Sequence, residues 1–368
     1  MTRADARPSQ GVLVTGMHRS GTSAVTRALH GLGLALPPAE DLMGSAESNP
    51  AGHFESWSLT SLNDQLLLAL GGTWSGPPEP PPGWEAAPAV GPLVDRATEA
   101  FARVYGRSRW VWKDPRTSLT LPFWRRVLGH HPLMLVFRHP AEVARSLEAR
   151  DRLEPEVGAA LWSRYVRALL EAAAGLPTFV AAWDRLREDF GGSMDAAAAW
   201  LADAGALPAG APAGRVRDLD EGIGSIRLSE AERREAPFVR PEDHALVDLL
   251  RSLEGPHVEL PRLELPAEAE ERTALLAARR AEELAALVRR ASAAETEALR
   301  GHAERLEAEL GDQARSREEI AAYARRLEEE VRRKADAEAE VRAYVRHLED
   351  EIRRKEAHID SLSRRTGP

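Results

Sequence analysis

The sequence predicts an α/β fold, with a P-loop-type parallel sheet flanked by helices and followed by a long C-terminal α-helix or coiled coil. Three observations carry this prediction. Residues 11–23 begin as an apolar run, pass through a glycine-bracketed loop and enter a helical pattern that extends to about Leu34. Residues 132–137 form a continuous apolar run, which is typical of a strand buried on both faces. After Pro266 the composition changes to Ala, Glu, Arg and Leu, which predicts a helical tail.

The loop between Gly16 and Gly21 is predicted to bind a phosphate group. Glycines let the backbone turn tightly, so that several N–H groups and the N-terminus of the following helix point at one anion. A Walker A loop would place Lys directly after the second glycine, but Thr22 stands there and Arg19 supplies a cation from within the loop. This difference argues against ATP or GTP as the ligand. The alternative is an ordinary strand-to-helix turn with two glycines.

Charged residues follow two further predicted strands. A β-rich segment that begins at Arg109 ends in the turn Lys113–Arg116, and the run 132–137 ends in Arg138, eight residues before Ser146. Because the carboxyl ends of parallel strands meet at one edge of a sheet, these residues are expected at a ligand site. Each of these features also has a simpler explanation when it is taken singly. The turn could hold an exposed ion pair that contributes almost nothing to stability. Arg138 could be a surface residue at the start of a helix.

The rest of the globular part is predicted in less detail. Residues 37–105 are rich in proline and are predicted to be loop-rich cover, in which Trp57, Trp74 and Trp84 either pack under loops or stack on a flat acceptor. Residues 205–236 have no readable pattern. Further elements are expected as a helix at 155–174, a strand at 178–183, a helix at 194–204 and a last helix at 239–250.

The segment 264–364 is predicted to be one long helix. A heptad pattern from about residue 320 has apolar residues at both core positions, which favours a parallel dimer: Val331, Val345 and Ile352 at one, and Leu327, Val341 and Leu348 at the other. Tyr323–Lys334 is repeated 21 residues later as Tyr344–Lys355, and this step of three heptads preserves the seam. Lys334, Glu338 and Lys355 weaken that seam. The alternative is therefore a solitary helix held by Glu–Arg pairs.

The composition indicates one globular domain over residues 11–260, preceded by a disordered N-terminus at 1–10. The chain of 368 residues has a net charge of −9 and no basic block, which argues against nucleic acid as a partner. It has no Cys, and its 11 His show no metal-ligand spacing, so no metal site is predicted. Neither a secretory signal nor a membrane span is apparent in the sequence, so the expected location is cytoplasmic.

Four stretches together resemble the sulfotransferases that use 3′-phosphoadenosine 5′-phosphosulfate (PAPS), in particular their bacterial and tyrosylprotein-type branch. The stretches are Gly16–Ser23, Asn49–Glu55, Lys113–Arg116 and Arg138–Ser146. The resemblance covers about the first 150 residues and continues more weakly to about residue 255. It implies that the 3′-phosphate is bound by Arg138 and Ser146. It also implies that the first stretch binds the 5′-phosphosulfate, through Gly16, His18, Arg19, Ser20, Gly21, Thr22 and Ser23.

The resemblance also implies a reaction, in which a sulfuryl group moves in line from PAPS to a hydroxyl group without a metal ion. A sulfuryl group carries less negative charge than a phosphoryl group, so fixed N–H dipoles and one or two cations suffice to stabilise its transfer. Glu55 is the expected base for the hydroxyl proton, with His53 and Glu47 as alternatives. Lys113 is expected to neutralise charge on the leaving phosphate oxygen, and Arg19 to orient the phosphosulfate.

The expected function is therefore that of a sulfotransferase acting on a glycan, a lipid-linked sugar or another hydroxyl compound, with self-association through the tail. One alternative is a P-loop kinase or NTPase, which would need a strand-end aspartate for Mg²⁺ where Arg138 stands. Another is a catalytically silent scaffold that acts through its coiled coil.

Overall fold

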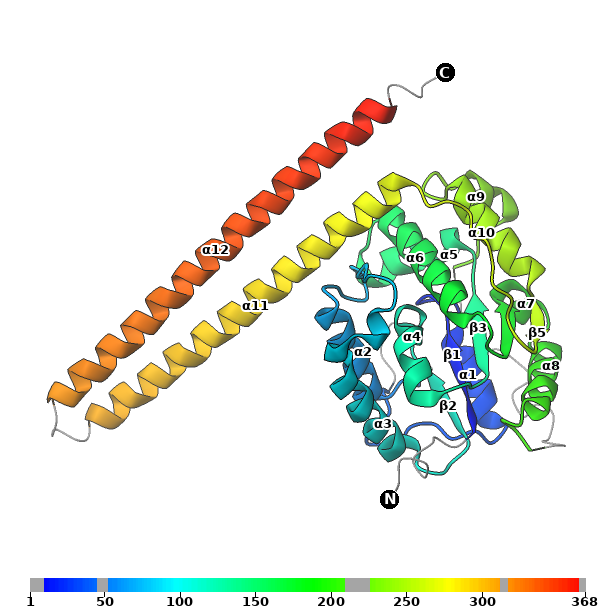
Figure 1. The fold of residues 1–368 in the computed structure, drawn as a ribbon, viewed down its shortest axis with the longest axis horizontal. Helices are drawn as coiled ribbons and strands as arrows, with labels where there is room; N and C mark the ends of the chain where they lie inside the picture. The colour runs from blue at the N-terminus through cyan, green and yellow to red at the C-terminus, as the bar shows by residue number, and fades with distance from the viewer. Residues whose placement is uncertain (1–9, 45–51, 209–225, 312–316, 364–368) are drawn as a thin grey trace. The chain divides into compact units, whose positions relative to one another are not determined.

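The computed structural model describes residues 10–44, 52–208, 226–311 and 317–363. Glu47, one of the alternatives for the base, lies outside these residues. The chain divides into two compact units, Met1–Ala269 and Glu270–Pro368. The first unit is a mixed α/β structure and the second is α-helical (Figure 1).

A five-stranded sheet, in the order β2-β1-β3-β4-β5, forms the centre of the described part of the first unit. The strands are β1 (Gly11–Thr15), β2 (Trp110–Lys113), β3 (Leu133–Phe137), β4 (Thr178–Ala182) and β5 (Gly255–His257). The first four are parallel, whereas β5 pairs antiparallel with β4. This architecture confirms the predicted α/β fold and its parallel sheet. The short strand β5 was not predicted.

The two faces of the sheet are covered by different helices because successive side chains of a strand point to opposite sides. On one face, Val12 and Val14 pack with α1 (Thr22–Gly31) and α8 (Phe190–Asp203) in a continuous hydrophobic core. On the other face, Trp112 packs against Trp124 of α4 (Thr117–Leu128), and the centroids of the two rings are 4.4 Å apart. The sheet is therefore buried on both sides, and its carboxyl edge is left for the loops that follow β1, β2 and β3 (Figure 1).

Three of the remaining helices agree with the predicted pattern, namely α5 (Pro140–Asp151), α6 (Pro155–Ala173) and α10 (Pro241–Ser252). The short helices α7 (Trp183–Glu188) and α9 (Glu230–Glu235) were not predicted, and α9 lies in the stretch 205–236 that had no readable pattern. The prediction of loop-rich cover at 37–105 is wrong in part, because α2 (Trp57–Ala69) and α3 (Gly91–Tyr105) lie there with the 3-10 helices η2 (Trp84–Ala86) and η3 (Pro88–Val90). The prolines of residues 77–82 lie between α2 and η2, and Pro88 and Pro92 lie in the first turns of η3 and α3, where proline fits.

The second unit contains two helices, α11 (Glu270–Gly311) and α12 (Arg317–Ser363), where one unbroken helix was predicted. The two helices run antiparallel, since Glu295 of α11 forms an ion pair with Lys334 of α12, whereas Glu271 at the start of α11 lines the same groove as Lys355 near the end of α12. Gly311 is the last residue of α11, and glycine has a low helix propensity. Each helix thus finds a partner for its apolar stripe within the same chain.

No helix among the described residues is long and apolar enough to cross a membrane.

Candidate active site

The loop after β1 folds tightly against the carboxyl ends of β3 and β4. Gly16 has φ of 149° and Gly21 has φ of 96°, a region that side chains rarely adopt. A Cβ atom on Gly16 would collide with the Val136 carbonyl oxygen, and one on Gly21 with the Trp183 ring. Gly21 is also the N-cap of α1, which no side chain caps. The loop and the helix N-terminus thus form the concave backbone surface that suits an anion.

Replacement of Gly16 with Ala is expected to lower the free energy of unfolding by at least about 3 kcal/mol, because a strained φ is combined with a backbone collision. Gly33→Ala is the matched control, since Gly33 also has a positive φ, of 100°, but nothing lies within 4 Å of its added Cβ. That variant is expected to lose about 1–2 kcal/mol from strain alone. Urea unfolding followed by tryptophan fluorescence compares the two. Equal losses would contradict the close approach.

His18 and Ser20 contribute buried polar atoms to this loop. Neither the His18 Nε2 nor the Ser20 Oγ has a hydrogen-bond partner among the described residues. The His18 ring packs between Trp74 and Tyr165, with centroids 4.8 and 5.9 Å away. Burial, followed by the charge of Arg116, holds the pKa of His18 well below its ordinary value, so the ring is neutral. Orphaned buried polar atoms are costly, and the oxygens of a phosphate or sulfate group would satisfy them.

The structure brings Arg19, Arg138 and Ser146 together at the same edge of the sheet. The Arg19 Nε donates a hydrogen bond to the Ser146 Oγ at 2.8 Å. The Arg138 Nη1 donates to the Arg19 carbonyl oxygen at 3.3 Å. Burial lowers the pKa of Arg19 to about 10, so its guanidinium stays charged at neutral pH. Two of the predicted nucleotide-binding stretches, far apart in the sequence, therefore form one cationic site.

Glu142 supports this cationic site, and the sequence analysis missed it. Its carboxylate is buried and accepts from the Arg138 Nε at 2.6 Å, the Arg233 Nη2 at 2.6 Å and the Leu228 backbone N–H at 3.1 Å. Arg138 also donates to the Ile226 carbonyl. Glu142 therefore fixes the Arg138 guanidinium and anchors the segment that leads into α9. The pair spans the start of α5, since Arg138 precedes the N-cap His139 and Glu142 lies in the first turn. The separation of four residues is its signal in the sequence.

Lys113, at the end of β2, contacts both Glu55 and Ser23 in the first turn of α1. Its Nζ lies 2.5 Å from the Glu55 Oε1 and 3.3 Å from the Ser23 Oγ. Burial raises the pKa of Glu55, but the charges of Lys113 and Arg116 outweigh this effect and hold that pKa below its ordinary value. The Glu55 carboxylate is therefore ionised at neutral pH, and it contacts the Lys113 ammonium group that also reaches Ser23.

Arg116 and Asp114 extend this network, and neither was assigned a role in the sulfotransferase site from the sequence; Asp114 was considered only as the Mg²⁺ aspartate of the alternative kinase. The Arg116 guanidinium lies 3.4 Å from the Glu55 Oε2 and 3.2 Å from the Asp114 Oδ1. The fully buried Asp114 also accepts from the Asn63 Nδ2 of α2 at 2.8 Å. Burial raises the pKa of Asp114, and Arg116 opposes this rise. The turn predicted to carry charge at the strand end thus has a second function, which is to join β2, α2 and Glu55.

The remaining predicted site residues lie around the same edge. Thr22 is buried as the first residue of α1, and its carbonyl oxygen accepts from the Thr26 hydroxyl. His53 is partly exposed, and its carbonyl oxygen accepts a long hydrogen bond of 3.4 Å from the Ser23 Oγ. Burial, followed by the charge of Lys113, lowers the pKa of His53. No group of three or more His, Cys, Asp or Glu able to hold a metal ion occurs in the described part of the chain.

No protein-family model matches the chain, and no curated protein matches it. Among solved structures, it is similar to the sulfotransferase domain from the Synechococcus PCC 7002 olefin synthase. That similarity has 18% identity and a TM-score of 0.33, and it covers 74% of this chain and 94% of that one. At this identity and TM-score the similarity carries no argument about function, so any functional conclusion depends on the residues of the site.

Proposed function

We propose that the first unit is a sulfotransferase that moves a sulfuryl group from PAPS to an acceptor hydroxyl. The observation that carries the proposal is the convergence of the four stretches. Lys113 contacts both Glu55 and Ser23, while Arg138 and Ser146 both contact Arg19. A nucleotide with phosphate groups on both the 3′ and the 5′ position of its ribose calls for this combination of a phosphate loop and separate cations.

The residues of the site fit the nucleotide in the proposed orientation. The backbone of Gly16–Ser23, with the hydroxyls of Ser20, Thr22 and Ser23, would hold the 5′-phosphosulfate, and the buried donors His18 and Ser20 would gain partners there. Arg138 and Ser146 would hold the 3′-phosphate, for which a guanidinium group is well suited. Arg19 would lie between the 5′-phosphosulfate and the 3′-phosphate and would orient the phosphosulfate.

In the proposed reaction the acceptor oxygen forms a bond to sulfur as the hydroxyl proton passes to the Glu55 carboxylate. The bond between sulfur and the bridging phosphate oxygen breaks, and its electron pair remains on the desulfated nucleotide, 3′-phosphoadenosine 5′-phosphate (PAP). Lys113 stabilises the negative charge that develops on that oxygen. Glu55 suits the role of base because its carboxylate is ionised and because it contacts Lys113, which also reaches Ser23 of the proposed phosphosulfate site.

The acceptor in this proposal is a glycan, a lipid-linked sugar or a similar hydroxyl compound. Trp57 is 58% exposed at the start of α2, two residues after Glu55. An exposed indole ring is suited to stacking on the apolar face of a sugar. Trp74 is partly buried and Trp84 is only 9% exposed. Trp57 is therefore the better candidate for acceptor contact among the three tryptophans considered from the sequence.

Calorimetric titration with PAP in the absence of metal ions tests the proposal. We expect binding by the unaltered chain and at least about 10-fold weaker binding by Arg138→Ala, which removes charge-assisted hydrogen bonds to the 3′-phosphate. Arg145→Ala is the matched control, because Arg145 lies on α5 and pairs with the exposed Glu148. Circular dichroism checks that each variant is folded.

The same titration with ATP and Mg²⁺ distinguishes the alternatives. Binding of ATP–Mg²⁺ without binding of PAP would overturn the proposal in favour of a P-loop kinase or NTPase. Failure to bind either nucleotide would favour the scaffold without catalytic activity.

A further inference from the structure

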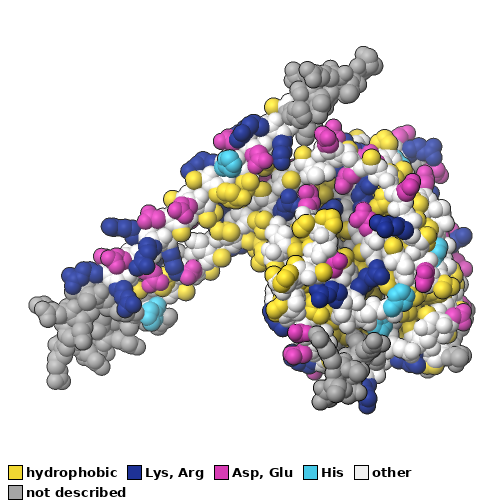
Figure 2. Space-filling view, viewed as in Figure 1, with side chains coloured by type: hydrophobic (Ala, Val, Ile, Leu, Met, Phe, Trp, Pro, Cys, Tyr) yellow, Lys and Arg dark blue, Asp and Glu magenta, His cyan; other side chains and the backbone are white. Residues whose placement is uncertain are grey.

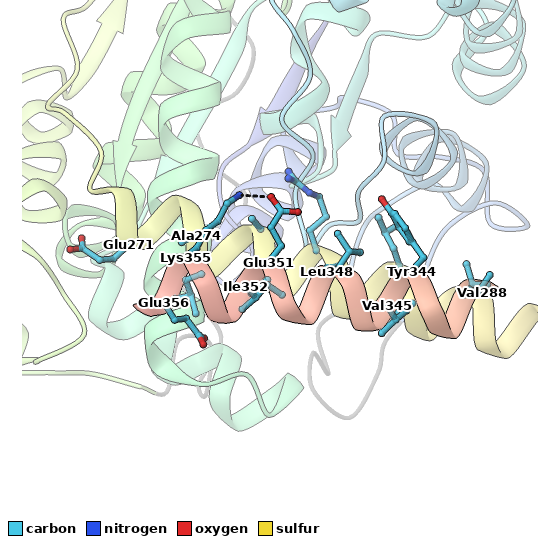
Figure 3. A pocket seen from close by; sticks show the side chains of 18 residues that line it. Glu271, Ala274, Val288, Tyr344, Val345, Leu348, Glu351, Ile352, Lys355 and Glu356 are labelled. Atoms are coloured by element: carbon cyan, nitrogen blue, oxygen red, sulfur yellow. Dashed lines mark ion pairs between the residues drawn. The ribbon is translucent and has the colours of Figure 1, made fainter. Parts of the chain in front are cut away.

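The helical unit has an apolar groove along the line where α11 and α12 meet. The groove has two parts. The larger part has a volume of about 620 Å³ and is lined by both helices (Figure 3). The apolar side chains that line it include Leu275, Leu284, Val288, Val345, Leu348 and Ile352. A second part of about 470 Å³ continues toward Glu295 and Lys334 and shares Val288, Val341 and Val345 with the first. The groove therefore extends along much of the hairpin.

The pairing of α11 with α12 leaves this seam incompletely buried. Val341, Val345, Leu348 and Ile352 occupy the heptad core positions of α12, yet each of them stays partly exposed to solvent. Tyr344, which also lines the groove, is 63% exposed. Two helices alone cannot enclose a core, because each covers only one side of the other. The heptad core residues thus still have an open side.

We propose that this groove binds the same groove of a second copy of the chain, so that two hairpins form an antiparallel four-helix bundle. The proposal concerns the helical unit alone and does not depend on the proposed activity. It replaces the parallel two-stranded coiled coil expected from the heptads, because α11 occupies one side of the α12 seam. Each seam residue would then contact helices from both copies.

The size of the groove matches that of a stable interface. From Glu271 to Glu295 the groove follows α11 for about 36 Å at 1.5 Å per residue, and two adjacent helices are about 20 Å wide. The footprint is therefore roughly 700 Å², close to the ~800 Å² per partner that stable protein interfaces bury.

The charges along the groove favour a second copy over a membrane surface. Figure 2 shows apolar side chains along the helical unit bordered by both acidic and basic residues. Both signs of charge occur at each end, with Glu351 paired to Lys355 near Glu271 and Glu338 paired to Arg342 near Lys334. A border of mixed charge lets two copies dock without repulsion between like charges. Helices that lie on membranes instead have a polar face dominated by Lys and Arg.

Sedimentation and light scattering of the full chain at micromolar concentration test this assignment. We expect a particle of twice the chain mass of 40.3 kDa. Tyr344→Glu is expected to shift the particle to the monomer mass, because it places a carboxylate in the interface while the hairpin itself barely buries Tyr344. Leu348→Glu is expected to do the same, and circular dichroism determines whether it also unfolds the helices.

Ala339→Glu is the matched control, because Ala339 is an exposed residue of α12 outside the groove. It is expected to remain a dimer. A monomeric unaltered chain, or a dimer that persists in Tyr344→Glu with full helix content, would overturn the proposal. A monomer that co-sediments with vesicles containing anionic lipid would assign the groove to a membrane surface instead.

Discussion

Replacement of Glu55 with Gln is expected to lower kcat by about 10²–10⁴-fold, the usual contribution of a positioned general base. The amide keeps the shape of the carboxylate but cannot take the hydroxyl proton. Binding of PAP is expected to change little, because Glu55 contacts Lys113 and Arg116 rather than the proposed phosphate-binding residues Arg138 and Ser146. The measurement is transfer of a radiolabelled sulfuryl group from PAPS to the hydroxyl compound that the unaltered chain uses fastest.

The pH dependence of this rate follows from the lowered pKa of Glu55. The carboxylate is ionised and able to accept a proton above that pKa, so activity is expected to fall only as the pH drops below the ordinary pKa of a Glu side chain. Glu55→Gln removes this acidic limb along with most of the rate. A profile with an acidic limb near pH 6 would instead indicate a histidine as the base.

Asp64→Asn is the matched control for Glu55→Gln. The Asp64 carboxylate also pairs with Arg116, at 2.6 Å, but its side chain is half exposed. Its replacement is expected to change kcat by less than about 3-fold. Equal losses in the two variants would mean that both carboxylates act only by holding Arg116, and the assignment of Glu55 as the base would fail.

The sequence predicted those features of the fold and site that depend on short stretches of chain. The strands β1, β2, β3 and β4 each have a local apolar signature, and each is present. Parallel pairing then places Lys113 and Arg138 at the same edge as the loop after β1, as strand polarity requires. The proximity of these cations could therefore be inferred before any contact was known.

The features that the sequence did not predict depend on contacts between distant residues. The pairing of Arg233 with Glu142 joins positions 91 residues apart, and that of Asn63 with Asp114 joins positions 51 apart. Nothing local in either sequence segment specifies such a partner.

In the tail, the predicted heptad positions Val341, Val345 and Leu348 lie along the groove with α11, whereas Val331 is half exposed. The heptads could not tell whether α11 or another chain would cover these residues. An apolar stripe specifies burial and not the identity of its partner.

Replacement of Asp114 with Ala is expected to lower the free energy of unfolding of the first unit by about 3–5 kcal/mol, the usual cost of removing one partner of a buried ion pair. Asp114 is fully buried and accepts hydrogen bonds from Asn63, Thr60 and Arg116. Its loss leaves these donors without their acceptor at the junction of β2 and α2.

The unfolding of this unit can be measured separately in the full chain. All 9 tryptophans precede residue 269, so the fluorescence change in urea reports the first unit alone. Asp64→Ala is the control, since an exposed partner of Arg116 is expected to contribute less than about 1 kcal/mol. Equal shifts in the two variants would contradict a stabilising role for the buried network. A larger loss for Asp114→Ala would show that the residues holding Arg116 beside Glu55 also hold α2 to the sheet, so the site and the fold share one set of contacts.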